Sequence, residues 1–194
     1  MKVAIIKYNA GNIRSVEFAL QRLGINCEIT DDPDRIKAAD KVIFPGVGSA
    51  GVTMQYLRER KLDEVIRSLQ QPVLGICLGQ QLLCSYSEED NTTCIGIFPQ
   101  KVRKFEPKLK VPHMGWNAIR NLRSPLFSAD LENRYVYFVH SYYVEVCEYT
   151  AATANYIVPF SAAMHYLNFY ATQFHPEKSG SVGETILRNF LQNT

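Results

Sequence analysis

Short apolar runs alternate with amphipathic stretches along the first half of the chain. Four of these runs have the length of buried strands, at residues 3–6, 27–29, 42–44 and 73–76. Between the first two, apolar residues recur at helical spacing: Val16, Ala19, Leu20 and Leu23. Gly24 is placed to close this helix, because glycine readily adopts the left-handed conformation of helix ends. Strands that alternate with helices predict parallel β-α-β units, with helices on both faces of the sheet.

The second half has a different pattern, in which strand-like segments dominate from about residue 94 to residue 173. These segments include residues 136–139, 142–146, 150–154 and 169–172. A final helix is predicted over residues 182–191. The sequence therefore predicts an α/β fold, with a mostly parallel sheet flanked by helices and an antiparallel extension in the second half. Because the chain has no repeat, low-complexity segment or linker, we expect residues 1–194 to form a single domain.

Composition and charge exclude several classes of function. The 194 residues are 46% hydrophobic and 21% charged, which is ordinary for a soluble globular protein, and a net charge of +2 does not indicate nucleic-acid binding. No apolar run approaches the ~18 residues of a membrane helix, and charge returns at Lys7, too early for a signal peptide. Five cysteines without paired or zinc-like spacing indicate a reducing compartment. We therefore expect a cytoplasmic protein without a metal or other cofactor.

The sharpest chemical signal is the segment Gly75-Ile76-Cys77-Leu78-Gly79, between an apolar strand and a helix-compatible stretch. A nucleophile on such a strand-to-helix turn needs small residues two positions before and after it. The amides that begin the following helix favour a thiolate, and the amide of Leu78 can bind a developing oxyanion. The simpler alternative is a buried cysteine with incidental glycines, since most free cysteines only fill a core.

A cysteine nucleophile needs a base, and the base needs an acid that orients it. His175 follows the predicted strand at residues 169–172, so it would reach the same sheet edge as Cys77. Glu177 lies two residues later, and Pro176 stiffens the link between them. Taken alone, a His-Pro-Glu segment is more often part of a surface loop. Together with the cysteine turn, it indicates a Cys-His-Glu triad.

Six segments, spread in order over the whole chain, form a recognisable set. They are residues 8–16, 45–48 (Pro-Gly-Val-Gly), 75–81, 112–117 (Pro-His-Met-Gly-Trp-Asn), 173–177 and 178–180. The set resembles the class I glutamine amidotransferases, and within them the glutaminase subunits of imidazole glycerol phosphate synthase. The resemblance implies a flavodoxin-like, class I amidotransferase fold. Lys7 departs from the family, which usually carries aspartate there.

The resemblance also implies a role for each matching residue. Catalysis would depend on Cys77, His175 and Glu177. The oxyanion hole would be formed by Val47, Gly48 and the amide of Leu78. Glutamine would be held by Gln81, Glu89, and the segment of His140, Ser141 and Tyr142.

In the family, ammonia passes to a cyclase subunit with a (β/α)₈ barrel. The cyclase forms imidazole glycerol phosphate and an aminoimidazole carboxamide ribotide during histidine biosynthesis. The resemblance therefore implies a heterodimer, with Met114 and Trp116 at the interface. Without it, Trp116 is equally compatible with an interface anchor and with core packing. Other interpretations are a glutaminase subunit of another ammonia-channelling synthase, a stand-alone γ-glutamyl cysteine hydrolase and a catalytically inactive regulatory module.

The segment expected to complete the oxyanion hole is suited to a conformational switch. Gly46 and Gly48 flank Val47, so the intervening peptide can flip at low steric cost. We expect the free protein to leave the hole incomplete, and a partner with its bound ligand to complete it. Loss of one oxyanion donor costs roughly 10²–10³ in rate, which is enough for a gate.

Overall fold

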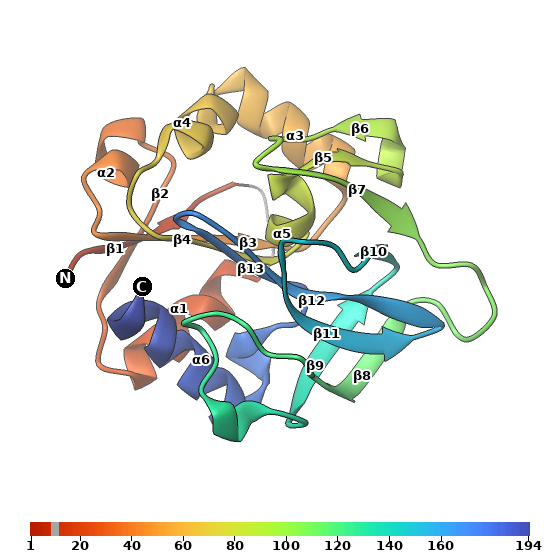
Figure 1. The fold of residues 1–194 in the computed structure, drawn as a ribbon. Helices are drawn as coiled ribbons and strands as arrows, with labels where there is room; N and C mark the ends of the chain where they lie inside the picture. Colours follow the sequence, from red (N-terminus) through yellow and green to blue (C-terminus); the bar gives the residue numbers. More distant parts are fainter. Residues whose placement is uncertain (9–11) are drawn as a thin grey trace.

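The computed structural model describes residues 1–8 and 12–194, and its central element is a seven-stranded sheet (Figure 1). The strand order is β11-β12-β13-β4-β3-β1-β2. Five neighbouring strands run parallel: β1 (Val3–Ile6), β2 (Cys27–Thr30), β3 (Lys41–Gly46), β4 (Val73–Cys77) and β13 (Phe169–Thr172). Residues 9–11, which belong to the first of the six sequence motifs, lie outside the described residues.

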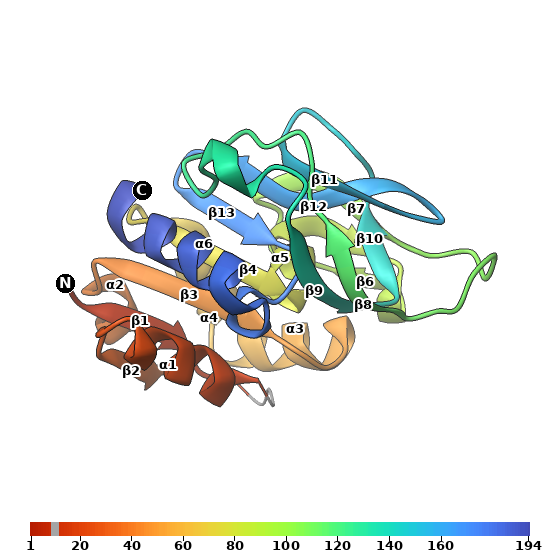
Figure 2. The same cartoon turned by 90° about the horizontal axis from the view of Figure 1, so that it is seen from below.

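Helices cover both faces of this sheet, as the alternation of strands and helices predicts. One face carries α1 (Ile13–Arg22) and α6 (Gly180–Asn193), seen nearest the viewer in Figure 2. The other face carries α2 (Pro33–Lys37), α3 (Ala50–Glu59), α4 (Leu62–Ser68) and α5 (Leu78–Leu83) (Figure 1). Successive side chains of β1 therefore enter different cores, Ile5 on the α1 side and Ile6 on the α3 side. Among the described residues, no helix is long and apolar enough to cross a membrane.

The antiparallel extension lies on the β13 edge of the sheet. Strand β12 (Val158–Tyr166) pairs antiparallel with both β13 and β11 (Thr150–Tyr156). A four-stranded sheet contains β10 (Tyr142–Val144), β7 (Phe98–Lys104), β5 (Cys84–Ser87) and β6 (Thr92–Thr93). A two-stranded sheet contains β8 (His113–Ala118) and β9 (Tyr135–His140). The predicted α/β class with an antiparallel second half is confirmed.

Several elements differ from those predicted, and β10 and α3 show the reasons. The strand expected over residues 142–146 ends at Val144, where the chain leaves β7, and Val146 is half exposed. Helix α3 is not among the predicted elements, although its apolar side is buried. Gly51 and Val52 in its first turn have low helix propensity, so the packing of this helix decides its conformation.

The parallel strands deliver several distant segments to one edge of the sheet. Gly46, at the end of β3, is paired in register with Cys77, at the end of β4. Strand β13 pairs with β4 on its other side and ends three residues before His175. Because the carboxyl ends of parallel strands share an edge, residues far apart in the sequence meet there.

Candidate active site

Cys77 occupies a strained turn between β4 and α5. Its φ of 55° and ψ of −107° lie outside the regions that non-glycine residues normally adopt. A Cβ atom on Gly79 would lie 2.0 Å from the carbonyl oxygen of Phe44, and one on Gly75 would lie 2.8 Å from Leu83 Cδ1. The turn therefore requires glycine on both sides of the cysteine, as the sequence predicts.

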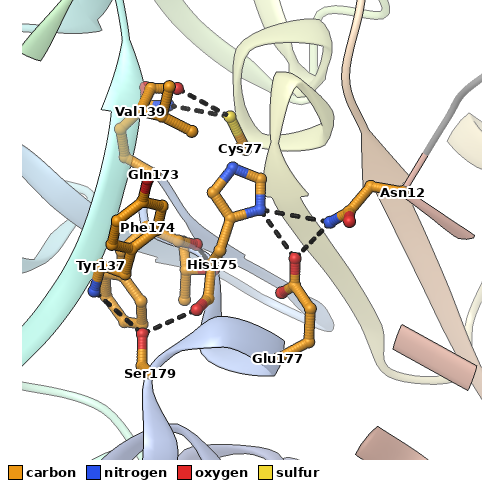
Figure 3. Close-up of polar contacts among 10 residues, drawn as sticks. Asn12, Cys77, Tyr137, Val139, Gln173, Phe174, His175, Glu177 and Ser179 are labelled. Carbon is orange, nitrogen blue, oxygen red and sulfur yellow. Dashed lines mark hydrogen bonds and ion pairs between the residues drawn. The ribbon is translucent and has the colours of Figure 1, made fainter. Parts of the chain in front are cut away.

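His175 lies beside Cys77 in the segment that follows β13, and Glu177 lies behind His175 in the short 3-10 helix η3 (Pro176–Lys178) (Figure 3). His175 Nδ1 is 2.7 Å from Glu177 Oε1, and both side chains are fully buried. His175 Nε2 points toward Cys77 and has no hydrogen-bond partner among the described residues. Because a carboxylate only accepts hydrogen bonds, the proton between the two groups is on His175 Nδ1, which donates it to Glu177 in a hydrogen bond. The other ring nitrogen is then free to exchange a proton with the thiol.

Burial and neighbouring charge act in opposite directions on His175. Burial disfavours the imidazolium, but the negative charge of a Cys77 thiolate and the contact with Glu177 outweigh it. The net effect raises the pKa of His175 above its ordinary value. His175 is therefore a stronger base than an ordinary histidine, as removal of a proton from a cysteine nucleophile requires.

Asn12 is a site residue that the sequence analysis did not identify. Its Nδ2 donates a hydrogen bond to Glu177 Oε1 and lies 3.4 Å from His175 Nδ1 (Figure 3). Asn12 is also the residue that precedes α1, but its side chain makes no capping hydrogen bond to that helix. Its position just after the first parallel strand indicates the correct sheet edge. The sequence carries no signal for its contact with Glu177, 165 positions away.

Ser179 fixes the loop that carries His175. Ser179 Oγ donates to the carbonyl oxygen of His175 at 2.6 Å and accepts from the amide of Tyr137 at 3.0 Å (Figure 3). The amide of His175 donates in turn to the carbonyl oxygen of Tyr137 at 2.9 Å. These bonds tie the loop to β9, so the imidazole is held from two sides of its backbone. Sequence reasoning placed Ser179 in a family motif without giving it a role.

A cavity of about 310 Å³ opens in front of Cys77 and His175. Its lining includes the residues predicted for the oxyanion hole and for glutamine binding: Val47, Gly48, Leu78, Gln81, Glu89, His140, Ser141 and Tyr142. Glu177 is not in the lining, because it lies behind His175. The structure thus brings the predicted triad and the predicted substrate-holding residues together at one cavity.

One wall of this cavity is a network of amides. Gln81 Nε2 donates to the carbonyl oxygen of Tyr142 at 3.1 Å and to Gln173 Oε1 at 3.0 Å. Gln173 Nε2 lies 3.7 Å from Cys77 Sγ. Both N–H groups of Gln81 are therefore engaged, and only its Oε1 can contact a ligand. A hydrogen-bond acceptor at this position suits a ligand ammonium group.

Glu89 also lines the cavity and is held there by the start of α3. Its Oε2 accepts a hydrogen bond from the amide of Ala50 at 2.8 Å. Partial burial raises the pKa of Glu89 above its ordinary value, against the opposing effect of the Ala50 hydrogen bond. A carboxylate with a reduced solvent shell has one oxygen left to bind a cation.

The segment after β3 contains a glycine in a backbone conformation that other residues rarely adopt. Gly48 has a φ of 117°, which side-chain-bearing residues rarely adopt, and it lines the cavity together with Val47. Tyr8 donates from its buried hydroxyl to the carbonyl oxygen of Pro45 and so anchors the base of this segment.

Met114 and Trp116 lie outside the cavity, on the outward face of β8. Their side chains are 60% and 56% exposed. Their partners across the ribbon are Val139 and Tyr137, whereas His113 and Asn117 face inward. The core-packing interpretation of Trp116 is therefore wrong, because an indole in a core would be buried.

The histidines outside the triad contact other side chains and, among the described residues, are not placed to bind a metal ion. Across residues 1–8 and 12–194, no group of three His, Cys, Asp or Glu side chains is placed to bind a metal ion. His113 hydrogen-bonds to His140, and His165 stacks on Tyr170 within the strands β12 and β13.

Comparisons with known proteins agree with this fold. Residues 4–194 match the family described as glutamine amidotransferase class-I. The solved structure of PurLQS from Thermotoga maritima superposes on this fold with a TM-score of 0.74. It is 15% identical in sequence, and the match covers 99% of this chain and 98% of that one. The chain belongs to the class-I glutamine amidotransferases.

Two curated relatives narrow this class. "Imidazole glycerol phosphate synthase subunit HisH" of Bacteroides fragilis (strain YCH46) is 62% identical, over 99% of this chain and 100% of the relative. The protein of the same name from Pasteurella multocida is 49% identical, over 98% of each. Within the class-I amidotransferases, the chain is therefore a member of the HisH family.

Proposed function

We propose that this chain is the glutaminase subunit of an imidazole glycerol phosphate synthase. It hydrolyses glutamine to glutamate and ammonia and passes the ammonia to a cyclase subunit. The observation that carries this proposal is the arrangement of Cys77, His175 and Glu177 at a cavity in a chain 62% identical to a HisH protein. The product of the cyclase would be imidazole glycerol phosphate, with an aminoimidazole carboxamide ribotide, in histidine biosynthesis.

The reaction begins with attack of Cys77 Sγ on the carbonyl carbon of the glutamine side chain. His175 Nε2 accepts the thiol proton, and Glu177 stabilises the resulting imidazolium through Nδ1. The carbonyl oxygen becomes an oxyanion and accepts hydrogen bonds from the amide of Leu78 and from the segment of Val47 and Gly48.

The tetrahedral intermediate collapses when its carbon–nitrogen bond breaks. His175 returns its proton to the departing nitrogen, which leaves as ammonia, and the acyl group remains on Cys77 as a thioester. A water molecule then attacks the thioester while His175 takes one of its protons. The same proton returns to the sulfur when glutamate leaves, so the enzyme is restored and no cofactor is consumed.

The α-amino and α-carboxylate groups of glutamine are held by residues that line the cavity outside the triad. Glu89 and Oε1 of Gln81 are acceptors suited to the α-ammonium group. Ser141 and Tyr142 line the same cavity, and their backbone and hydroxyl donors suit the α-carboxylate.

The partner of this subunit is a cyclase with a (β/α)₈ barrel, and its docking surface includes Met114 and Trp116. Exposed apolar side chains on a two-stranded ribbon next to the catalytic loop support this assignment, since aromatic residues are enriched at interface centres. Docking there would bring the barrel close to the site at which ammonia is released.

The oxyanion segment makes glutaminase activity depend on the partner. In the free subunit the donor between Val47 and Gly48 does not face the cavity, and partner binding with its nucleotide ligand turns it inward. The glycine conformation at Gly48 supports this gate, because such a backbone position can change at low steric cost.

The test is ammonia release from glutamine by the purified chain, alone and with a cyclase subunit plus its nucleotide ligand. Strong release only with the partner and ligand is expected, and Cys77→Ala should abolish it. Cys27→Ala is the matched control, because this half-buried cysteine lies on β2, away from the cavity. Equal release without the partner would point instead to a stand-alone hydrolase. No release under any condition would overturn the proposal.

A further inference from the structure

Two buried histidines lie at the wall of the candidate glutamine cavity, His140 in its lining and His113 behind His140. His113 on β8 and His140 on β9 are directly opposite each other in the antiparallel ribbon. Both side chains face inward, on the side away from Met114 and Trp116. The mechanism above uses neither ring, although His140 borders the cavity.

The hydrogen bonds around these rings have only one consistent direction. His140 Nδ1 is 2.7 Å from the carbonyl oxygen of Tyr142, which can only accept, so this nitrogen carries the proton. In the neutral ring, His140 Nε2 is then an acceptor. It receives its hydrogen bond from His113 Nδ1 at 3.0 Å. Both rings must therefore be protonated on Nδ1.

The chain of bonds continues to Asn117 on the same strand as His113. Asn117 Nδ2 lies 3.4 Å from His113 Nε2, the remaining acceptor of that ring. The orientation of the Asn117 amide is fixed by two backbone groups. Its Nδ2 donates to the carbonyl oxygen of Asn155 at 3.0 Å, and its Oδ1 accepts from the amide of Ala118 at 2.8 Å.

The surroundings of the pair keep both rings uncharged. His113 stacks on Tyr156, with 4.1 Å between ring centroids, and on Phe138, at 5.0 Å. Burial lowers the pKa of His113 to about 4. Burial also lowers the pKa of His140 to about 3, and the hydrogen bond to Tyr142 only partly opposes this effect. Neither ring carries a proton on both nitrogens at neutral pH, so the direction of each hydrogen bond, from donor to acceptor, is preserved.

The series of hydrogen bonds ends at a backbone carbonyl group in the cavity wall. The Tyr142 carbonyl oxygen accepts from His140 Nδ1 and also from Gln81 Nε2, which in turn contacts Gln173 beside Cys77. Fixing this one carbonyl therefore sets the position of the segment of Ser141 and Tyr142 relative to the glutamine-holding amide of Gln81.

We propose that His113 is a positioning residue of the glutaminase site, which acts through His140 to hold the Tyr142 carbonyl and the wall that binds the α-amino and α-carboxylate end of glutamine. This inference rests on the proposed function. Without the donor at His113 Nδ1, His140 Nε2 is a buried acceptor with no partner. The ring of His140 then loses its fixed orientation, and the segment of Ser141 and Tyr142 is no longer held in position.

The first experiment compares two variants of similar shape in the complex with the cyclase subunit. His113→Asn keeps an N–H donor near the position of Nδ1, whereas His113→Leu has none, and both lose the ring stacking. We expect His113→Leu to raise the KM for glutamine about 3- to 10-fold over His113→Asn, the size of one neutral hydrogen bond. The kcat values should agree within about twofold, as expected when only binding is lost. Equal KM values in the two variants would overturn the positioning role.

The second experiment does not depend on glutaminase activity. Nitrogen-15 NMR of the histidine side chains in the wild-type chain reports which ring nitrogen carries the proton. We expect His113 and His140 to be neutral at neutral pH, with the proton on Nδ1 in both. A proton on Nε2 of either ring would be incompatible with this series of hydrogen bonds and would refute the inference, even in a fully active enzyme. If the protein releases no ammonia but both rings carry the proton on Nδ1, the proposed function is refuted. The series of hydrogen bonds from His113 to Tyr142 is then still supported.

Discussion

The contact between Asn12 and Glu177 leads to a quantitative prediction for the substitution Asn12→Ala. Glu177 Oε1 accepts from two side chains, His175 Nδ1 and Asn12 Nδ2. Glu177 Oε2 has no hydrogen-bond partner among the described residues. The substitution therefore removes one of the two donors that hold this carboxylate against the imidazole.

The size of the effect follows from burial and charge. The Glu177 side chain is fully buried, so solvent does not screen the contact. A hydrogen bond to a charged group contributes about 1.5–3 kcal/mol. At 1.36 kcal/mol for each factor of ten, kcat should fall about 10- to 150-fold. The KM for glutamine should change little, because Asn12 does not line the cavity.

The assay is steady-state ammonia release by the complex with the cyclase subunit and its ligand. Asn189→Ala is a matched control: the Asn189 side chain donates to the carbonyl oxygen of Leu126 at 3.0 Å, remote from the triad. This control should lose some stability but keep its kcat. Asn12→Asp, which has the same shape without a donor, should be at least as slow as Asn12→Ala. A kcat for Asn12→Ala within twofold of wild type would refute the assignment of Asn12 to the triad.

Three further predictions concern the turn, the substrate and the docking surface. Gly79→Ala would place a Cβ 2.0 Å from the Phe44 carbonyl oxygen, so we expect a loss of at least ~3 kcal/mol of stability in chemical denaturation, and a loss below ~1 kcal/mol would contradict the geometry. The raised pKa of Glu89 means that its carboxylate protonates at a higher pH than an ordinary glutamate. On acidification, the KM for glutamine should therefore begin to rise at that higher pH; Glu89→Gln should remove this dependence, and an unchanged profile would exclude Glu89 from binding. Trp116→Ala should weaken binding of the cyclase at least ~10-fold by calorimetry without altering the thermal unfolding of the free chain, and unchanged affinity would place the interface elsewhere.

The local sequence pattern is sufficient to predict the layered arrangement of the fold and the identity of the reacting residues. The apolar runs locate the parallel strands, and their alternation with amphipathic stretches predicts the helices on both faces, because each pattern reflects the period of its element. The placement of Cys77 between two glycines and of His175 after a predicted strand brings both to the same sheet edge. These are local features, and local features can be read from a sequence.

Elements whose conformation depends on packing could not be predicted in the same way. Helix α3 contains Gly51 and Val52 in its first turn, and its burial against the sheet overrides their low helix propensity. The strand β10 ends at Val144, where its pairing with β7 stops, although Val146 beyond it is a residue of strand type. Pairing partners across the sheet, and not local propensity, set that boundary.

The contacts that complete the site arise only when the chain is folded. Asn12 meets Glu177 across 165 positions, and His113 meets His140 because β8 and β9 pair in one register. The sequence supplies the side chains for each contact, but not the distance or the direction of the hydrogen bond between them. Those depend on the packing of whole strands and helices, so the triad is predictable from local pattern, whereas the residues that hold it in place are visible only in the three-dimensional arrangement.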